Sequence, residues 1–216
     1  NEGVYALRDL LGSDVKDDLD KIKGIGYKKD RHLILNPPQH VVPENKMDVD
    51  LPGYAWDLLP YHKKTLDLYR SHFWHADYDH HQRTPFAALY TSLGCPFKCD
   101  FCMINIINRV NNRDEITSAN SSHIRYWSPD LILKEFDKLA EMGVKTIRLS
   151  DEMFFLNHQH VEPVLKGLIK RDYDLRMWSY ARVDTIAPKY LKLFRLAGIK
   201  WLAVGFESGN HAVRRG

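Results

Sequence analysis

The chain has few cysteines, no long hydrophobic run and no excess of one charge. Only three of its 216 residues are cysteines, and an odd, clustered set cannot form a complete disulfide framework. A disulfide-stabilised scaffold is therefore excluded, and a reducing, cytoplasmic setting is expected. The longest apolar runs, such as 87–90, fall far below the roughly 18 residues that cross a bilayer, so no membrane span is expected.

Charge and composition exclude several further classes. The 31 basic and 28 acidic residues are interspersed and give a net charge of +3, a balance that predicts nothing about an acidic membrane and gives no evidence of nucleic-acid binding. Hydrophobic residues at 44% and charged residues at 27% are typical of globular proteins, so disorder, collagen and coiled coil are excluded. The chain starts with Asn1 and shows no charged-then-apolar leader, so we expect a piece of a longer protein or a processed product.

The first third of the chain reads as a short folded segment followed by a connector. Apolar residues at helical spacing predict a helix near the start of 4–25, and "KIKGIGYKKD" predicts a turn and a short strand. Five of the ten prolines lie within 35–60, which predicts an extended linker. Residues 61–82 begin with helix-compatible spacing and end in a polar, histidine-rich loop.

From residue 86 onward the pattern alternates between strands and helices. "FAALYTSLG" predicts a buried strand, and Ser128, Pro129 and Gly143 mark the N-cap, first residue and end of a helix. Three more strands follow, in "VKTIRLSD", "LRMWSYARVD" and "IKWLAVGFESG", with helices between them. This alternation predicts an α/β fold with a parallel sheet. Polar residues directly after the strands favour an incomplete TIM-like (βα) barrel, because such barrels place their chemistry at the carboxyl ends of the strands.

The three cysteines, Cys95, Cys99 and Cys102, lie within eight consecutive positions of "TSLGCPFKCDFCMI". Thiols with the spacing C-x3-C-x2-C on one loop can converge on a single metal centre. A structural zinc site takes four ligands, and a histidine upstream could supply the fourth; the candidates are His72, His75, His80 and His81. An iron–sulfur cluster held by three thiolates instead of four leaves one iron open for a substrate or cofactor. The residues alone leave both interpretations open, together with a set of buried thiols that holds no metal.

The motif, with Phe101 directly before its last cysteine and a strand before its first, resembles the radical SAM superfamily. The resemblance implies a 4Fe-4S cluster on Cys95, Cys99 and Cys102, with S-adenosylmethionine on the fourth iron. It also implies reductive cleavage of that cofactor to a 5′-deoxyadenosyl radical, a small-molecule substrate, and a reductant such as flavodoxin or ferredoxin.

The same resemblance implies S-adenosylmethionine contacts from residues at the strand ends. Phe101 would lie near the adenine, and the remaining contacts would come from Asp151, Glu152, Arg182 and Glu207. Acidic groups and one arginine suit a cofactor with cationic groups, a carboxylate and ribose hydroxyls. Each residue also has a structural alternative: Asp151 as a helix N-cap, Arg182 as an ion-pair partner of Asp184, and Glu207 in a polar turn.

The amino-terminal segments "EGVYALRDLL" and "DVDLPGYAWDLLP" resemble the end of the cobalamin-binding domain and the linker found in one radical SAM subfamily. The resemblance implies a remnant of that Rossmann-like domain at 1–35, a Pro-rich and His-rich linker at 36–82, and the first part of a radical SAM barrel at 83–216. It favours cobalamin-dependent methylation of an unactivated carbon. The alternatives are a radical SAM enzyme without cobalamin, either methylthiotransferase-like or a cyclase, and a Cys3His zinc-binding interaction module.

Overall fold

A computed structural model describes most of the chain; the residues described are 3–13, 18–60, 86–97, 99, 102 and 124–215. The chain divides into two compact units. One spans 1–52 and 94–125, and the other spans 53–93 and 126–216. No helix in the described ranges combines the length and apolar character needed to cross a membrane.

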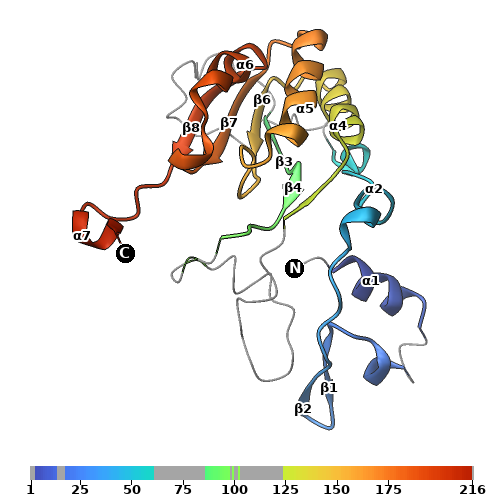
Figure 1. Cartoon of the computed structure of the whole chain (residues 1–216). Helices are drawn as coiled ribbons and strands as arrows, with labels where there is room; N and C mark the ends of the chain where they lie inside the picture. Colours follow the sequence, from blue (N-terminus) through green and yellow to red (C-terminus); the bar gives the residue numbers. More distant parts are fainter. Residues whose placement is uncertain are drawn as a thin grey trace. The chain divides into compact units, whose positions relative to one another are not determined.

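The first unit contains a short helix and a β-hairpin. Helix α1 covers Val4–Leu11, and strands β1 (Gly26–Lys29) and β2 (His32–Leu35) pair antiparallel (Figure 1). The turn between the strands places Asp30 and Arg31 at φ of 48° and 67°, the left-handed conformation that two-residue hairpin turns require. The predicted helix and the strand that begins within "GIGYKKD" are confirmed, whereas the second strand of the hairpin, β2, was not predicted.

The proline-rich segment is not extended throughout. It contains the short helix α2 (Met47–Asp50) and two 3-10 helices, Glu44–Lys46 and Trp56–Leu58. Its prolines lie outside these turns, and Pro43 is the extended residue that precedes the first of them. Because proline restricts the residue before it and suits a helix start, the segment alternates between extended and helical stretches.

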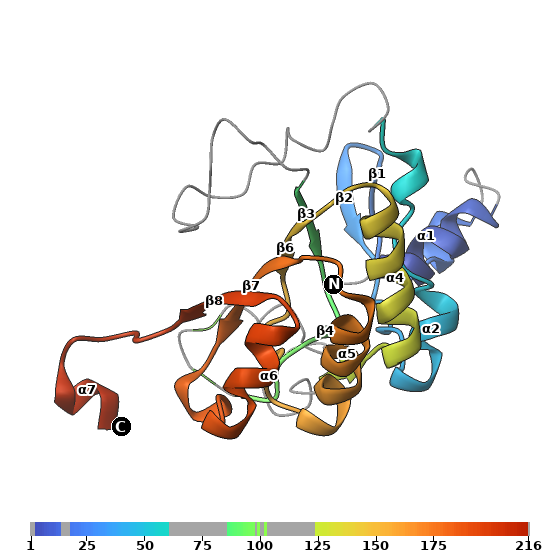
Figure 2. The ribbon, with the colours of Figure 1, turned by 90° about the horizontal axis from the view of Figure 1, so that it is seen from above.

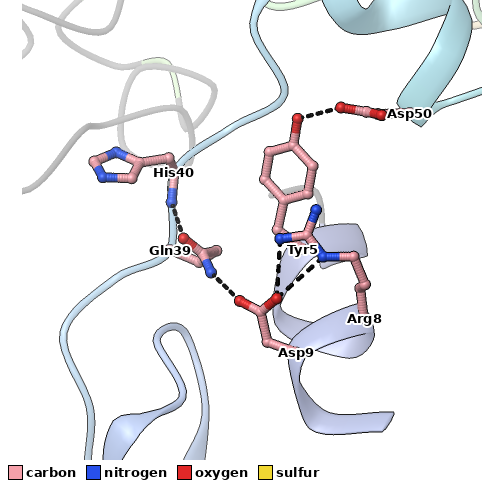
Figure 3. A network of polar contacts seen from close by, with 6 residues as sticks. All are labelled: Tyr5, Arg8, Asp9, Gln39, His40 and Asp50. Atoms are coloured by element: carbon pink, nitrogen blue, oxygen red, sulfur yellow. Dashed lines mark hydrogen bonds and ion pairs between the residues drawn. The ribbon is translucent and has the colours of Figure 1, made fainter. Parts of the chain in front are cut away.

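A polar network fastens α1 to residues 39–50 within the first unit (Figure 3). The Tyr5 hydroxyl donates to Asp50 Oδ2 at 2.5 Å. Gln39 Nε2 donates to Asp9 Oδ2 at 2.9 Å, while Arg8 forms an ion pair with the other oxygen of Asp9 at 2.9 Å. The bonds from Tyr5 and Gln39 join residues 45 and 30 positions apart, so they stabilise tertiary structure and not the helix alone.

The second unit is built on a four-stranded parallel sheet with the order β3-β6-β7-β8. The strands are Phe86–Leu89, Thr146–Leu149, Arg176–Ala181 and Ile199–Val204. Two shorter strands, β4 (Ser92–Leu93) and β5 (Arg125–Tyr126), form a separate sheet. The predicted parallel α/β fold is confirmed, and the strand expected over "FAALYTSLG" is interrupted at residues 90–91.

Three helices lie along one face of this sheet (Figure 1, Figure 2). They are α4 (Pro129–Glu141), α5 (His158–Arg171) and α6 (Leu191–Leu196), and a short helix α7 (His211–Arg215) follows β8. Ser128 Oγ accepts a hydrogen bond from Leu131 N at 3.2 Å, and Gly143 lies just after α4 at φ 75°. The predicted cap, first residue and end of α4 are therefore confirmed.

The core of this unit lies between the sheet and its helices. Ala87, Ile147, Met177 and Ile199 stand in register on the four strands and are each at most 4% exposed. Side chains alternate between the two faces of a strand, so the intervening residues lie on the opposite face. That face is more polar and more open, and it carries Arg148 on β6 and the 40% exposed Tyr180 on β7.

Candidate functional site

Polar side chains follow every strand of the parallel sheet at its carboxyl end. Thr91 follows β3, Asp151 follows β6, Arg182 follows β7, and Glu207 lies three residues beyond β8. Because parallel strands end at the same edge, the fold collects these residues on one side of the sheet, as the sequence predicts. Their individual environments differ strongly.

Asp151 is the most enclosed of these residues, with 0% exposure. Its Oδ1 accepts a hydrogen bond from Thr91 N at 2.8 Å, and its Oδ2 accepts from the hydroxyls of Thr91 and Ser92, each at 2.6 Å. Burial raises the pKa of Asp151, whereas the hydrogen bonds from Ser92 and Thr91 favour its charged form. The carboxylate thus joins the end of β6 to residues 90–92, which leave β3 and are called here the exit of β3. It does not cap a helix, because the N-cap of α5 is Asn157.

Tyr54 holds Tyr90, the residue before Thr91 at the exit of β3. Its hydroxyl oxygen accepts a hydrogen bond from the backbone N–H of Tyr90 at 2.8 Å. Burial raises the pKa of Tyr54 to about 12, and the nearby charge of Asp151 acts in the same direction. Residues 90, 91 and 92 are therefore each bonded to a group from another part of the unit, just before Gly94 at φ 96° and Cys95.

A buried carboxylate on α4 in turn holds the segment that contains Tyr54. Glu135 is 3% exposed and accepts hydrogen bonds from Trp56 Nε1 at 2.8 Å and from Tyr54 N at 3.3 Å. It also forms an ion pair with Lys138 at 2.7 Å. The rings of Tyr54 and Trp56 stack with centroids 4.8 Å apart. Residues 53–58 are thus fixed to α4, although the sequence alone assigned them to a linker.

Glu152 follows β6 and acts electrostatically on a second group of side chains, around Tyr90 and Arg148. It is partly buried, and after burial itself its charge is the largest effect that raises the pKa of Tyr90. Arg148 lowers that pKa, and its Nη2 donates to the Tyr180 hydroxyl at 2.8 Å. The Arg148 guanidinium lies 4.9 Å from the ring centroid of Trp178, in a cation–π arrangement. Arg148, Trp178 and Tyr180 were not predicted as part of a site; their signal was the alternation of polar and aromatic residues along "TIRL" and "RMWSYA".

Arg182 and Glu207 are exposed. Arg182 forms two hydrogen bonds with Asp184, at 3.0 Å and 2.7 Å, and its guanidinium holds the pKa of Asp184 below the ordinary value. The ion pair considered as an alternative is therefore present. Glu207 has φ 57° and folds its carboxylate over Gly205.

The three cysteines are partly buried, and Cys102 N donates to Cys99 O at 3.0 Å, which closes a backbone turn. These cysteines fall in the first unit. Phe101 and the histidines at 72–81 lie outside the described residues. Within the described part of the chain, no three His, Cys, Asp or Glu side chains form a group that could hold a metal ion. In their chemistry, three thiols separated by C-x3-C-x2-C fit the thiolate ligands of an iron–sulfur cluster.

The chain is similar to known proteins over most of its length. Residues 89–215 match the model of the radical SAM superfamily. An uncharacterized methyltransferase of Pyrococcus horikoshii is 24% identical over 214 residues, which cover 97% of this chain and 39% of that protein.

Two solved structures show the same fold. One is the cobalamin-dependent S-adenosylmethionine radical enzyme OxsB, with aqua-cobalamin and S-adenosylmethionine bound. It superposes with a TM-score of 0.67 at 24% identity, and the match covers 100% of this chain and 28% of the OxsB chain. The other is the radical S-adenosylmethionine methyltransferase TsrM from Kitasatospora setae, with tryptophan substrate and aza-SAM bound. Its TM-score is 0.60 at 17% identity, and the match covers 97% of this chain and 37% of the TsrM chain.

The chain spans less than two fifths of the length of each of these three relatives. The match to the superfamily covers more than half of the chain and includes the three cysteines and the carboxyl ends of all four strands of the parallel sheet. The chain belongs to the radical SAM superfamily.

Proposed function

We propose that Cys95, Cys99 and Cys102 hold a 4Fe-4S cluster, and that the whole protein cleaves S-adenosylmethionine reductively to a 5′-deoxyadenosyl radical. The observation that carries this proposal is the position of the three thiols: they follow the first strand of a parallel sheet, inside the region that matches the superfamily. When bound, the cluster would supply the electron for this cleavage. The protein's own residues would bind and orient the cofactor.

The residues proposed to contact S-adenosylmethionine are those at the carboxyl edge of the sheet. Glu152 and Glu207 offer carboxylates for its cationic groups, and Arg182 offers a guanidinium for its carboxylate. Phe101 is proposed to lie against the adenine. The contact predicted for Asp151 is left out of this proposal, because its carboxylate is buried and bonded to Thr91 and Ser92.

We further propose cobalamin-dependent methylation of an unactivated carbon in a small-molecule substrate. Support comes from the likeness to a methyltransferase and to OxsB and TsrM. In this proposal residues 1–35 belong to the end of a cobalamin-binding domain, and a flavodoxin or ferredoxin supplies the electron. The alternative within the superfamily is a reaction without cobalamin, such as methylthiolation or cyclisation.

Anaerobic reconstitution tests the metal assignment. We expect a brown protein with broad absorbance at about 400 nm that dithionite bleaches. A colourless protein that retains one zinc ion would instead support the Cys3His module. Added cobalamin should then bind to the full-length protein, and label from methyl-labelled S-adenosylmethionine should appear on protein-bound cobalamin; if neither occurs, the reaction without cobalamin is favoured.

A further inference from the structure

We propose that Asp151 is a positioning residue for the three-cysteine segment: it fixes the exit of β3 so that the thiols are presented in one arrangement. This inference rests on the proposed function, because it concerns the loading of the cluster. It gives Asp151 a role through Thr91 and Ser92 in place of direct contact with S-adenosylmethionine.

Hydrogen bonds within the protein use both oxygens of the Asp151 side chain. Both of its carboxylate oxygens accept hydrogen bonds, at 2.8 Å and 2.6 Å, and all three donors come from the consecutive residues Thr91 and Ser92. The side chain is 0% exposed. A carboxyl group in this state orients its donors, because moving it would leave its buried oxygens and a buried N–H without partners.

Only a short piece of chain separates Ser92, which Asp151 holds, from the first of the three thiols. Cys95 follows Ser92 by three residues, which span at most about 11 Å. Tyr54 holds Tyr90 at the same exit with a bond of 2.8 Å. With three consecutive residues fixed, the segment that leads to Cys95 loses much of its conformational freedom before any metal binds.

The other acidic residues at this edge of the sheet differ from Asp151 in their exposure. Glu207 is exposed and Glu152 is partly buried, so both have surface that a ligand could approach. Asp151, in contrast, is fully buried, and both of its carboxylate oxygens accept hydrogen bonds from Thr91 and Ser92.

The test compares Asp151→Ala with Asp137→Ala in the full-length protein. Asp137 is a matched control because it also accepts three hydrogen bonds from two residues, Arg171 and Tyr173, but it joins helix α4 to the end of α5. We expect Asp151→Ala to lower cluster occupancy under limiting iron by roughly tenfold or more, the range found when groups that support metal ligands are removed. Asp137→Ala should leave the occupancy unchanged.

A milder pair of variants keeps the test valid if Asp151→Ala does not fold. Thr91→Val removes one hydroxyl donor to Asp151 and keeps the side-chain shape, whereas Thr91→Ser keeps the donor. We expect Thr91→Val to lower iron per chain and to alter the electron paramagnetic resonance spectrum of the reduced cluster. Thr91→Ser should restore both.

Three results would overturn the inference. Full occupancy and an unchanged spectrum in both Asp151→Ala and Thr91→Val would show that the anchor does not position the thiols. An intact cluster with weakened S-adenosylmethionine binding in Asp151→Ala would show direct contact. A wild-type protein that binds no iron–sulfur cluster would overturn the proposed function and this inference with it.

Discussion

Glu135 on α4 and Trp56, 79 residues apart in the sequence, are joined by a buried hydrogen bond of 2.8 Å. The same carboxylate accepts from the backbone of Tyr54, whose hydroxyl holds the residue after β3. Glu135 therefore supports, through Tyr54, the strand end from which the cysteine segment departs.

Replacing Glu135 by Ala should lower the free energy of unfolding by about 2–4 kcal/mol, because Trp56 Nε1 and Tyr54 N would lose a charged acceptor. The matched control is Glu162→Ala, which breaks an exposed i,i+4 pair with Lys166 and should change the free energy of unfolding little, because solvent screens exposed pairs. Urea unfolding of both variants measures the difference. Equal losses would contradict a buried structural role for Glu135.

Gly53→Ala should destabilise the protein more than Gly143→Ala. Both glycines have positive φ, 105° and 75°, so each alanine adds a left-handed strain of roughly 1 kcal/mol. At Gly53 the added methyl would also collide with the Glu135 carboxylate, whereas at Gly143 it meets nothing within 4 Å. Thermal melting should give a lower Tm for Gly53→Ala; identical melting curves would contradict the described packing of Gly53 on Glu135.

Stability should fall as the pH is lowered from 6.5 toward 4. Burial lowers the pKa of His160 from 6.5 to about 4, and its Nε2 is a buried nitrogen that finds no hydrogen-bond partner among the described residues. In this window the unfolded chain binds a proton at His160 and the folded chain does not. The contribution, about 1–2 kcal/mol after screening, is thus complete above pH 6.5 and is lost progressively toward pH 4.

A His160→Phe variant isolates this effect. It keeps an aromatic ring against Tyr126, whose centroid lies 4.4 Å from that of His160, and it removes the titrating group. The dependence of unfolding free energy on pH between 4 and 6.5 should become shallower than in the wild type. An unchanged slope would mean that other groups cause the loss.

Arg182→Ala should weaken S-adenosylmethionine binding by roughly tenfold or more if its guanidinium holds the cofactor's carboxylate. Asp184→Ala removes the observed partner of Arg182 and leaves the guanidinium, so it should change the affinity little. Isothermal titration of the reconstituted full-length protein measures both. Equal effects of the two substitutions would indicate that the ion pair is structural.

The alternation of strand and helix patterns was enough to predict the parallel α/β fold, and the details predicted correctly are those set by neighbouring residues. Ser128, Pro129 and Gly143 delimit α4 because caps and stops act within one turn of a helix, and the Arg182–Asp184 pair could be foreseen because the two residues lie two positions apart. The cysteine motif, on which the resemblance to the superfamily rested, likewise depends only on local spacing.

The anchors of the β3 exit escaped prediction because they depend on strand order and register. Asp151 lies 60 residues from Thr91, and Tyr54 lies 36 residues from Tyr90. These pairs meet only because β6 stands beside β3 and because residues 53–58 pack on α4. A composition rich in proline indicated a linker at 35–60, but it could not reveal that Trp56 finds a buried acceptor on a distant helix.

The most direct test of the proposed function is the formation of 5′-deoxyadenosine from S-adenosylmethionine by the full-length protein, reconstituted without oxygen and reduced with dithionite. We expect 5′-deoxyadenosine from the wild type, and none from Cys95→Ala, Cys99→Ala or Cys102→Ala, each of which would remove one cluster ligand. Product from any of the three variants would contradict the ligand assignment, and a cluster-loaded wild type that forms no product would contradict the proposed reaction.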